Sequence, residues 1–150
     1  MQISETWYSE IESTLLTTLE YKLVEKANAP FPNLTCTTSS ENDSVDGIAT
    51  FPTLYIHLLP LVEVGMDLTN ESVNAVRATL ELQVFSNRSE AECRKIMTRG
   101  LQEMKLLHFN VTSFPDYQTS NKRYFAIARC TRIIAGGDSE IVPRLEEGTE

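Results

Sequence analysis

Two histidines and three cysteines are the side chains in this sequence best suited to chemistry. His57 lies inside an apolar run and His108 lies at the end of a helical pattern, and each is expected to be structural rather than catalytic. Cys36, Cys93 and Cys130 follow no zinc-ligand spacing, and their odd number is typical of free thiols in a reducing compartment. These residues predict neither a nucleophile–base pair nor a metal site.

An acidic cluster formed by Glu41, Asp43 and Asp46 raises the possibility of calcium binding. The cluster lacks the regular ligand spacing and the terminal glutamate of a calcium-binding loop. The sequence also contains no nucleophile elbow, phosphate-binding loop, zinc-protease motif or dinucleotide-binding glycine motif. We therefore predict that the protein is not an enzyme and uses no cofactor and no metal.

Positive side chains gather in two regions. They are Arg94, Lys95 and Arg99 on the solvent side of a predicted helix, and Lys122, Arg123, Arg129 and Arg132 on the last predicted strand. One interpretation is a solvated face, which is common. The other is a patch that meets an acidic surface on another subunit of an oligomer.

Length and charge restrict the class of protein. The chain has 150 residues, which is enough for one domain and hardly enough for two. Its net charge of −8 argues against a general nucleic-acid binder but is compatible with a protein past which DNA must move. The first residues do not resemble a signal peptide, and no run of 18 apolar residues predicts a membrane span.

Two helices are predicted from apolar residues at helical spacing. The first covers residues 4–27, where an apolar stripe recurs every four residues at Trp7, Ile11, Leu15, Leu19 and Leu23. The second begins at Ser89, which forms a capping-box pattern with Glu92, and continues to about Leu107. Gly100, in its middle, is interpreted as a position of close packing.

Strands are predicted at 51–59, 74–86, 109–114 and 122–134, and residues 60–73 either extend the first strand or form a hairpin tip. The second strand alternates apolar and polar residues, so one of its faces should be buried. Residues 28–49 are predicted as a long loop, and SFPDYQTSN as a turn. The acidic tail, 136–150, is predicted to be disordered.

These elements predict an α+β fold in the order α-β-β-α-β-β. Helices and hairpins are segregated along the chain, so we expect a mainly antiparallel four-stranded sheet with two helices on one face. Residues 1–135 would form this single domain.

Four phrases in this order resemble the tail terminator, or tail completion, proteins of long-tailed bacteriophages. They are FPTLYI, NAVRATLELQVFSN, SEAECRKIMTRGLQEMKLLHF and NKRYFAIARCTRII. The matching features are Phe51-Pro52, the segment 83–86, the helix start at 89–92, the phrase 107–109, and Arg123-Tyr124 with Arg129. The resemblance covers about residues 3–135, and His108 stands where the family more often has glycine.

The resemblance implies a structural function. Proteins of this family form a ring, expected to be a hexamer, that caps the head-proximal end of the tail tube, stops its polymerisation and offers the surface that docks to the head. Its partners would be other copies of itself, the tail tube protein and a head–tail connector or stopper protein. DNA would pass through without specific binding, and the protein would be assembled in the host cytoplasm and reside in the virion.

Two alternatives stay open from the sequence: a head-completion, stopper or other neck protein, and a small ligand-binding α+β module. The loop 33–46 and the hairpin tip 65–72 are polar and are expected to project from the sheet. The residues expected at a subunit or tail-tube interface are Asn33, Glu41, Asp43, Asp46, Asp67, Asn70, Glu71, Arg123 and Arg129.

Overall fold

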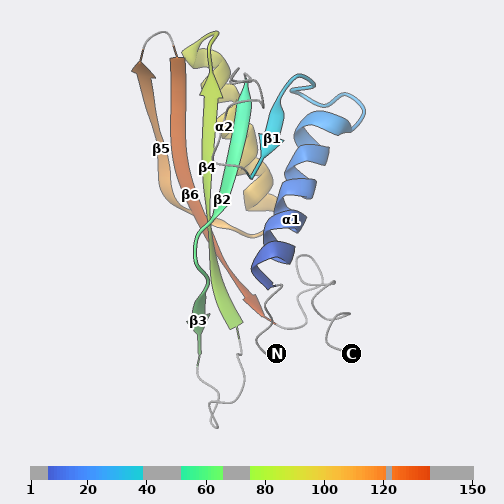
Figure 1. Cartoon of the computed structure of the whole chain (residues 1–150), viewed down its shortest axis with the longest axis vertical. Coiled ribbons are helices and arrows are strands. Elements are labelled where there is room, and N and C mark those ends of the chain that lie inside the picture. Colours follow the sequence, from blue (N-terminus) through green and yellow to red (C-terminus); the bar gives the residue numbers. More distant parts are fainter. Residues whose placement is uncertain (1–6, 39–51, 66–74, 121–122, 136–150) are drawn as a thin grey trace.

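The computed structural model describes residues 7–38, 52–65, 75–120 and 123–135 (Figure 1). In chain order the elements are α1 (Trp7–Glu20), its π-helical continuation η1 (Tyr21–Glu25), β1 (Thr35–Thr37), β2 (Thr53–Leu58), β3 (Val62–Val64), β4 (Ala75–Ser86), α2 (Glu90–Leu106), β5 (Asn110–Ser120) and β6 (Arg123–Ala135). The predicted acidic tail lies outside the described residues.

The described strands form one six-stranded mixed sheet in the order β1-β2-β4-β6-β5, with β3 also paired to β4. The prediction of a four-stranded antiparallel sheet is therefore wrong. β1 arises within the segment predicted as the loop 28–49, and it pairs with β2 in parallel, Thr35 opposite Thr53. The Thr35 amide donates to the Pro52 carbonyl at 3.1 Å, which lets these few residues extend the sheet edge.

β3 is a separate strand because a proline interrupts the pairing of β2 with β4. The Leu59 amide still donates to the Thr79 carbonyl at 2.9 Å. Pro60 follows and has no amide hydrogen to offer. Pairing then resumes with Val62 opposite Arg77, so β2 and β3 lie along the same edge of β4.

β5 runs through the segment that was predicted as a turn. Its pairing with β6 is irregular between Ser113 and Asp116, which is where Phe114 and Pro115 lie. Proline is tolerated in edge strands and at bulges, because no ladder hydrogen bond is lost there. The predicted short strand 109–114 and the turn after it are therefore wrong, since β5 and β6 form one long hairpin.

Both helices contribute to a single core. Ile11, Leu15, Leu19 and Leu23 are all buried, which confirms the inward stripe of the first helix except at Trp7, whose side chain lies outside the described part. In Figure 1, α1 lies beside β1 and β2, and α2 lies behind the strands. The Tyr8 hydroxyl donates to the Leu58 carbonyl and so ties α1 to the end of β2.

α2 covers the centre of the sheet. Its N-terminus is capped as predicted, because the Ser89 Oγ accepts a hydrogen bond from the Glu92 amide at 3.1 Å. Gly100 packs directly on the sheet: a Cβ at this position would approach Leu82 Cδ2 to 3.3 Å. The close-packing interpretation of Gly100 is thereby confirmed.

The alternation predicted for β4 is also confirmed. Val76, Ala78, Leu80, Leu82 and Val84 are buried. The residues between them point to the other face, which no described helix covers and which we call the open face (Figure 1).

Candidate functional site

The open face carries a flat array of polar, aromatic and apolar side chains from three strands. Its members are partly buried or exposed, as expected for a sheet surface without a covering layer. They are Tyr55 and His57 on β2, Arg77, Thr79, Glu81, Gln83 and Phe85 on β4, and Phe125, Ile127, Arg129, Thr131 and Ile133 on β6.

A polar row crosses the middle of the open face. His57, Glu81 and Arg129 are opposite one another in register on β2, β4 and β6. Arg129 Nε donates to Glu81 Oε2 at 2.9 Å, and Gln83 Nε2 donates to Glu81 Oε1 at 2.7 Å. Each carboxylate oxygen thus accepts a hydrogen bond, which holds the row in one geometry.

Aromatic and apolar side chains lie on either side of this row. Phe85 and Phe125 stack with ring centroids 6.1 Å apart at the end near β1. At the other end, Val62, Arg77 and Ile133 are register neighbours, and Val62 and Ile133 are more than half exposed. A mixed surface of this kind is suited to contact with another macromolecule.

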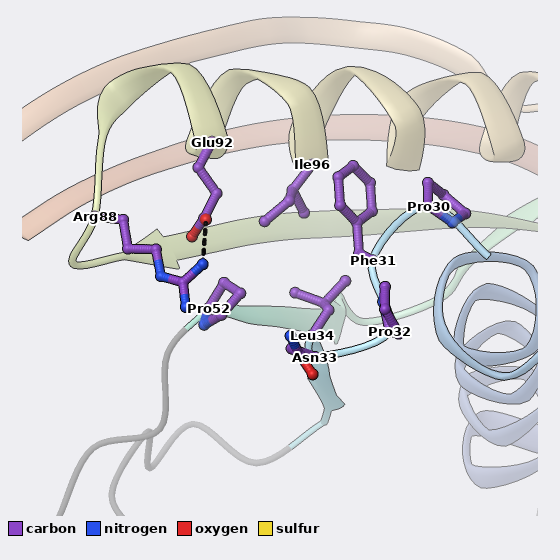
Figure 2. Close-up of a pocket in the computed structure, with 9 residues that line it drawn as sticks. All are labelled: Pro30, Phe31, Pro32, Asn33, Leu34, Pro52, Arg88, Glu92 and Ile96. Carbon is purple, nitrogen blue, oxygen red and sulfur yellow. Dashed lines mark ion pairs between the residues drawn. The ribbon is translucent and has the colours of Figure 1, made fainter. Parts of the chain in front are cut away.

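A small pocket with a mixed apolar and polar lining lies at the other face, where the N-terminus of α2 meets the segment before β1 (Figure 2). Its volume is about 160 Å³. The apolar part of its lining comes from three segments: Pro30, Phe31, Pro32 and Leu34 before β1, Pro52 before β2, and Ile96 on α2. The remaining lining residues are Asn33, Arg88 and Glu92.

The polar end of the pocket is ordered by hydrogen bonds. The Ser86 hydroxyl donates to Glu92 Oε1 at 2.8 Å and accepts from the Arg88 amide at 3.2 Å. Arg88 Nη1 lies 3.7 Å from Glu92 Oε2, a long ion pair (Figure 2). The Arg88 side chain is 70% exposed, so the pocket presents a cationic group to solvent at its rim.

A basic flank of α2 adjoins the pocket and consists of Arg94, Lys95 and Arg99. Together with Thr98, Gln102, Pro30 and Phe31, these residues line an open depression of about 480 Å³. Arg94 is engaged, since it pairs with Glu90 at 2.8 Å and lies 4.2 Å from the Tyr117 ring centroid. Within the described ranges, neither Lys95 nor Arg99 has a carboxylate partner.

The three cysteine thiols are expected to be unreactive. Burial, with the nearby Glu20 and Glu25 carboxylates, raises the pKa of Cys36 to about 12. Burial alone raises the pKa of Cys130 to about 12, and burial is also the largest cause that raises the pKa of Cys93 to about 11. At neutral pH these groups are protonated, and a thiol is a poor nucleophile and a poor metal ligand.

The described residues contain no group of three or more histidine, cysteine or carboxylate side chains that could hold a metal ion. In the same ranges, no helix has the length and apolar character needed to cross a membrane.

The structure describes three of the nine residues predicted at an interface. Asn33 is exposed at the pocket rim (Figure 2). Arg123 and Arg129 are exposed on the open face of β6, where six residues along a strand separate them by roughly 20 Å. The structure does not bring these three together, and the other predicted residues lie outside the described ranges: Glu41, Asp43, Asp46, Asp67, Asn70 and Glu71.

Sequence reasoning missed the pocket and the exposed Phe114. The Pro30-Phe31-Pro32 phrase was a usable signal, because phenylalanine is among the residue types most often buried. No local signal pairs that phrase with Ile96 or Arg88, which are more than fifty residues away. A scan of known protein families finds no model that matches this chain, and a search of curated proteins finds no match.

Proposed function

We propose that this chain is a tail terminator subunit of a long-tailed bacteriophage. It assembles as a ring, with six copies expected, on the head-proximal end of the tail tube. The ring stops tube polymerisation and provides the surface to which the head docks. Its partners are other copies of itself, the tail tube protein and a head–tail connector or stopper protein, and DNA passes through the ring without specific binding.

The observation that carries this proposal is the open face. It has the form of a contact surface, with ordered charges at its centre and stacked or exposed apolar side chains on both sides. A ring subunit that also meets the tail tube and the head needs a contact surface of this kind in addition to the patches that join neighbouring copies. The ordered resemblance of four sequence phrases to the tail terminator family supports the same conclusion.

A small ligand-binding module is the alternative of another class, and the pocket before β1 is the observation that favours it. Pockets for metabolites and cofactors usually measure about 300–1,000 Å³. The volume here is about 160 Å³, which is below that range, and the adjoining depression of about 480 Å³ is open rather than enclosed. The pocket is therefore better suited to a single side chain than to a small-molecule ligand.

The decisive experiment is deletion of the gene from its parent genome, followed by electron microscopy of the particles. We expect abnormally long tail tubes and unattached, DNA-filled heads, because nothing would stop tube growth or offer the docking surface. Supplying the wild-type chain in trans should restore tubes of normal length.

Two other results would contradict the proposal. Free tails of normal length beside heads that leak DNA would assign the protein to the head side of the joint, as a head-completion or stopper protein. Unaltered virions would remove it from the neck altogether.

A further inference from the structure

Phe114 is the most exposed large apolar side chain in the described part of the chain, at 77%. It lies on β5, an edge strand of the sheet. Ser113 pairs with Arg129 and Asp116 pairs with Ile127, so two residues, Phe114 and Pro115, stand opposite a single residue of β6. A bulge of this kind redirects side chains away from the regular alternation.

Exposure alone does not assign a role to Phe114, because isolated apolar side chains are common on protein surfaces. The pocket before β1 supplies the second observation. Its volume is about 160 Å³, and most of its lining is proline, phenylalanine, leucine and isoleucine. An apolar cavity of about 150 Å³ is large enough to hold a benzene molecule. The pocket therefore has the size to accept one phenyl ring, and six of its nine lining residues are apolar.

Phe114 is not part of the pocket of its own chain. It is 77% exposed on β5 at one edge of the sheet, and it is absent from the pocket lining, much of which comes from the segment before β1 at the other edge. A Phe114 ring that occupies such a pocket therefore belongs to another copy, joined head to tail. Contacts of this kind close into a ring where the rotation between copies permits it.

The charges near Phe114 and at the pocket rim also favour a contact between the two. Asp116 is exposed two residues after Phe114, and its Oδ2 accepts one hydrogen bond, from Gln118 Nε2 at 3.0 Å. At the pocket rim, Arg88 is held to Glu92 only at 3.7 Å and is mostly exposed. The basic flank of α2 adjoins this rim, because the depression it lines shares Pro30 and Phe31 with the pocket. Its Lys95 and Arg99 add positive charge beyond the Arg88–Glu92 and Arg94–Glu90 pairs.

We propose that the Phe114 ring of one copy occupies the pocket before β1 of the next copy, and that Asp116 pairs there with Arg88. The contact rests on the proposed function, since it is the joint between neighbouring subunits of the ring. It names the two surfaces that meet and the side chain that anchors them. Buried aromatic anchors of this type dominate the energetics of interfaces.

Cross-linking between introduced cysteines tests the contact. Ser113→Cys and Asn33→Cys place one thiol beside Phe114 and one at the pocket rim, and both positions are exposed. The anchor and the charged pair stay intact. A short bismaleimide reagent is applied to the purified full-length chain at high concentration and to tails purified from infected cells. The native thiols react poorly because burial raises the pKa of each one.

We expect a ladder of cross-linked oligomers from the double variant and none from either single variant. Phe114→Ala in the double-cysteine background should reduce the ladder at least about tenfold, since loss of an anchoring aromatic has effects of this size or larger. Leu106→Ala is the matched control, because Leu106 is also an exposed large apolar residue, at 69%, and it should leave the ladder unchanged. Melting temperatures of both variants should equal that of the parent.

Charge reversal adds an independent readout. Arg88→Glu and Asp116→Arg should each weaken the ladder, and the two together should restore it. Absence of a ladder from both samples would overturn the contact, as would dimers formed by Ser113→Cys alone, which would indicate a two-fold contact.

The outcomes for contact and function are distinguishable. A missing ladder combined with long tubes in the deletion would remove the contact and keep the terminator function. A ladder combined with unaltered virions in the deletion would keep the contact and remove the function.

Discussion

Cys93 and Cys130 each donate a hydrogen bond from Sγ to a carbonyl of β4, at 3.7 Å, to Val84 and Leu80 respectively. Both side chains are fully buried, and Cys36 is partly buried at the sheet edge. A buried thiol of this type behaves as a small apolar residue with a weak hydrogen-bond donor. At the scale of single residues, the cysteines therefore contribute packing and not reactivity.

The first prediction concerns thiol reactivity. At pH 8 the native chain should react with a thiol–disulfide reagent far more slowly than the guanidinium-unfolded chain, because burial raises the pKa of all three cysteines. The rate of colour release measures this difference. Release of a full equivalent in the native state, as fast as after unfolding, would contradict the burial of at least one thiol.

The same pKa shifts determine whether the free energy of unfolding rises or falls with pH. An unfolded thiol titrates near a pKa of about 8.5, whereas the folded values are about 11 to 12. Below pH 8.5 both states are protonated and the contribution of burial is complete. As the pH rises further, the unfolded state loses protons that the folded state retains, so the free energy of unfolding should decrease.

Residue-level roles were only partly predictable from the sequence. Arg129 was expected at an interface because it is a cation on an exposed strand face. Its actual partner, Glu81, is 48 residues away, and only the register of β4 against β6 brings them together. The polarity of Asn33 predicts that it is exposed, but its place at the rim of the pocket depends on Ile96 and Pro52, which no local pattern connects to it.

At the scale of elements, one small residue of α2 sets the distance between this helix and the sheet. Gly100 lets the helix approach Leu82 of β4, and an added Cβ would lie 3.3 Å from Leu82 Cδ2. Helix propensity alone would favour almost any other residue at this position. The glycine is therefore explained by packing against the sheet.

The second prediction follows from this contact. Gly100→Val should lower the free energy of unfolding by roughly 1–3 kcal/mol, because the added atoms overpack the helix–sheet contact. Gln102→Val is the matched control on the exposed side of α2 and should cost less than about 1 kcal/mol. Urea denaturation measures both values. Equal stability of the two variants would show that α2 shifts freely on the sheet.

Element types followed from the sequence where the pattern was long and regular. The alternation from Val76 to Val84 indicates a strand with one buried face, and Ser89 with Glu92 indicates the start of α2. The pattern failed where tertiary contacts override local preference. Pro115 marks a turn in most contexts but is accommodated here at an edge bulge, and β1 exists only because β2 offers a neighbouring edge.

At the scale of the whole molecule, one group of cations stands beside the pocket of an acidic protein. The net charge is −8, yet the basic flank of α2 and the rim residue Arg88 form a margin of cations there, in which Glu92 pairs with Arg88 and Glu90 pairs with Arg94. The overall field should repel nucleic acid, while the local margin attracts an acidic protein surface.

The third prediction tests whether the overall negative charge outweighs the basic flank of α2 when the protein meets DNA. Near physiological salt, the full-length chain should bind labelled duplex DNA more weakly than a dissociation constant of about 10⁻⁴ M, the weak end of non-specific binding. Fluorescence anisotropy measures this affinity. Salt-dependent binding that Lys95→Glu with Arg99→Glu abolishes would instead assign the basic flank to DNA.

The position of β4 also has a consequence for synthesis on the ribosome. β4 lies at the centre of the sheet, and all twelve of its residues pair with β6. β2 and β3 precede β4, but β6 is translated only after α2 and β5. One edge of β4 therefore stays open while the rest of the domain is being made, at about 5–20 residues per second. Unpaired edges of this kind are where nascent chains associate with one another. The time that the ribosome takes between β4 and β6 thus sets how long each nascent copy is exposed to premature association, before the proposed contact between finished subunits can form.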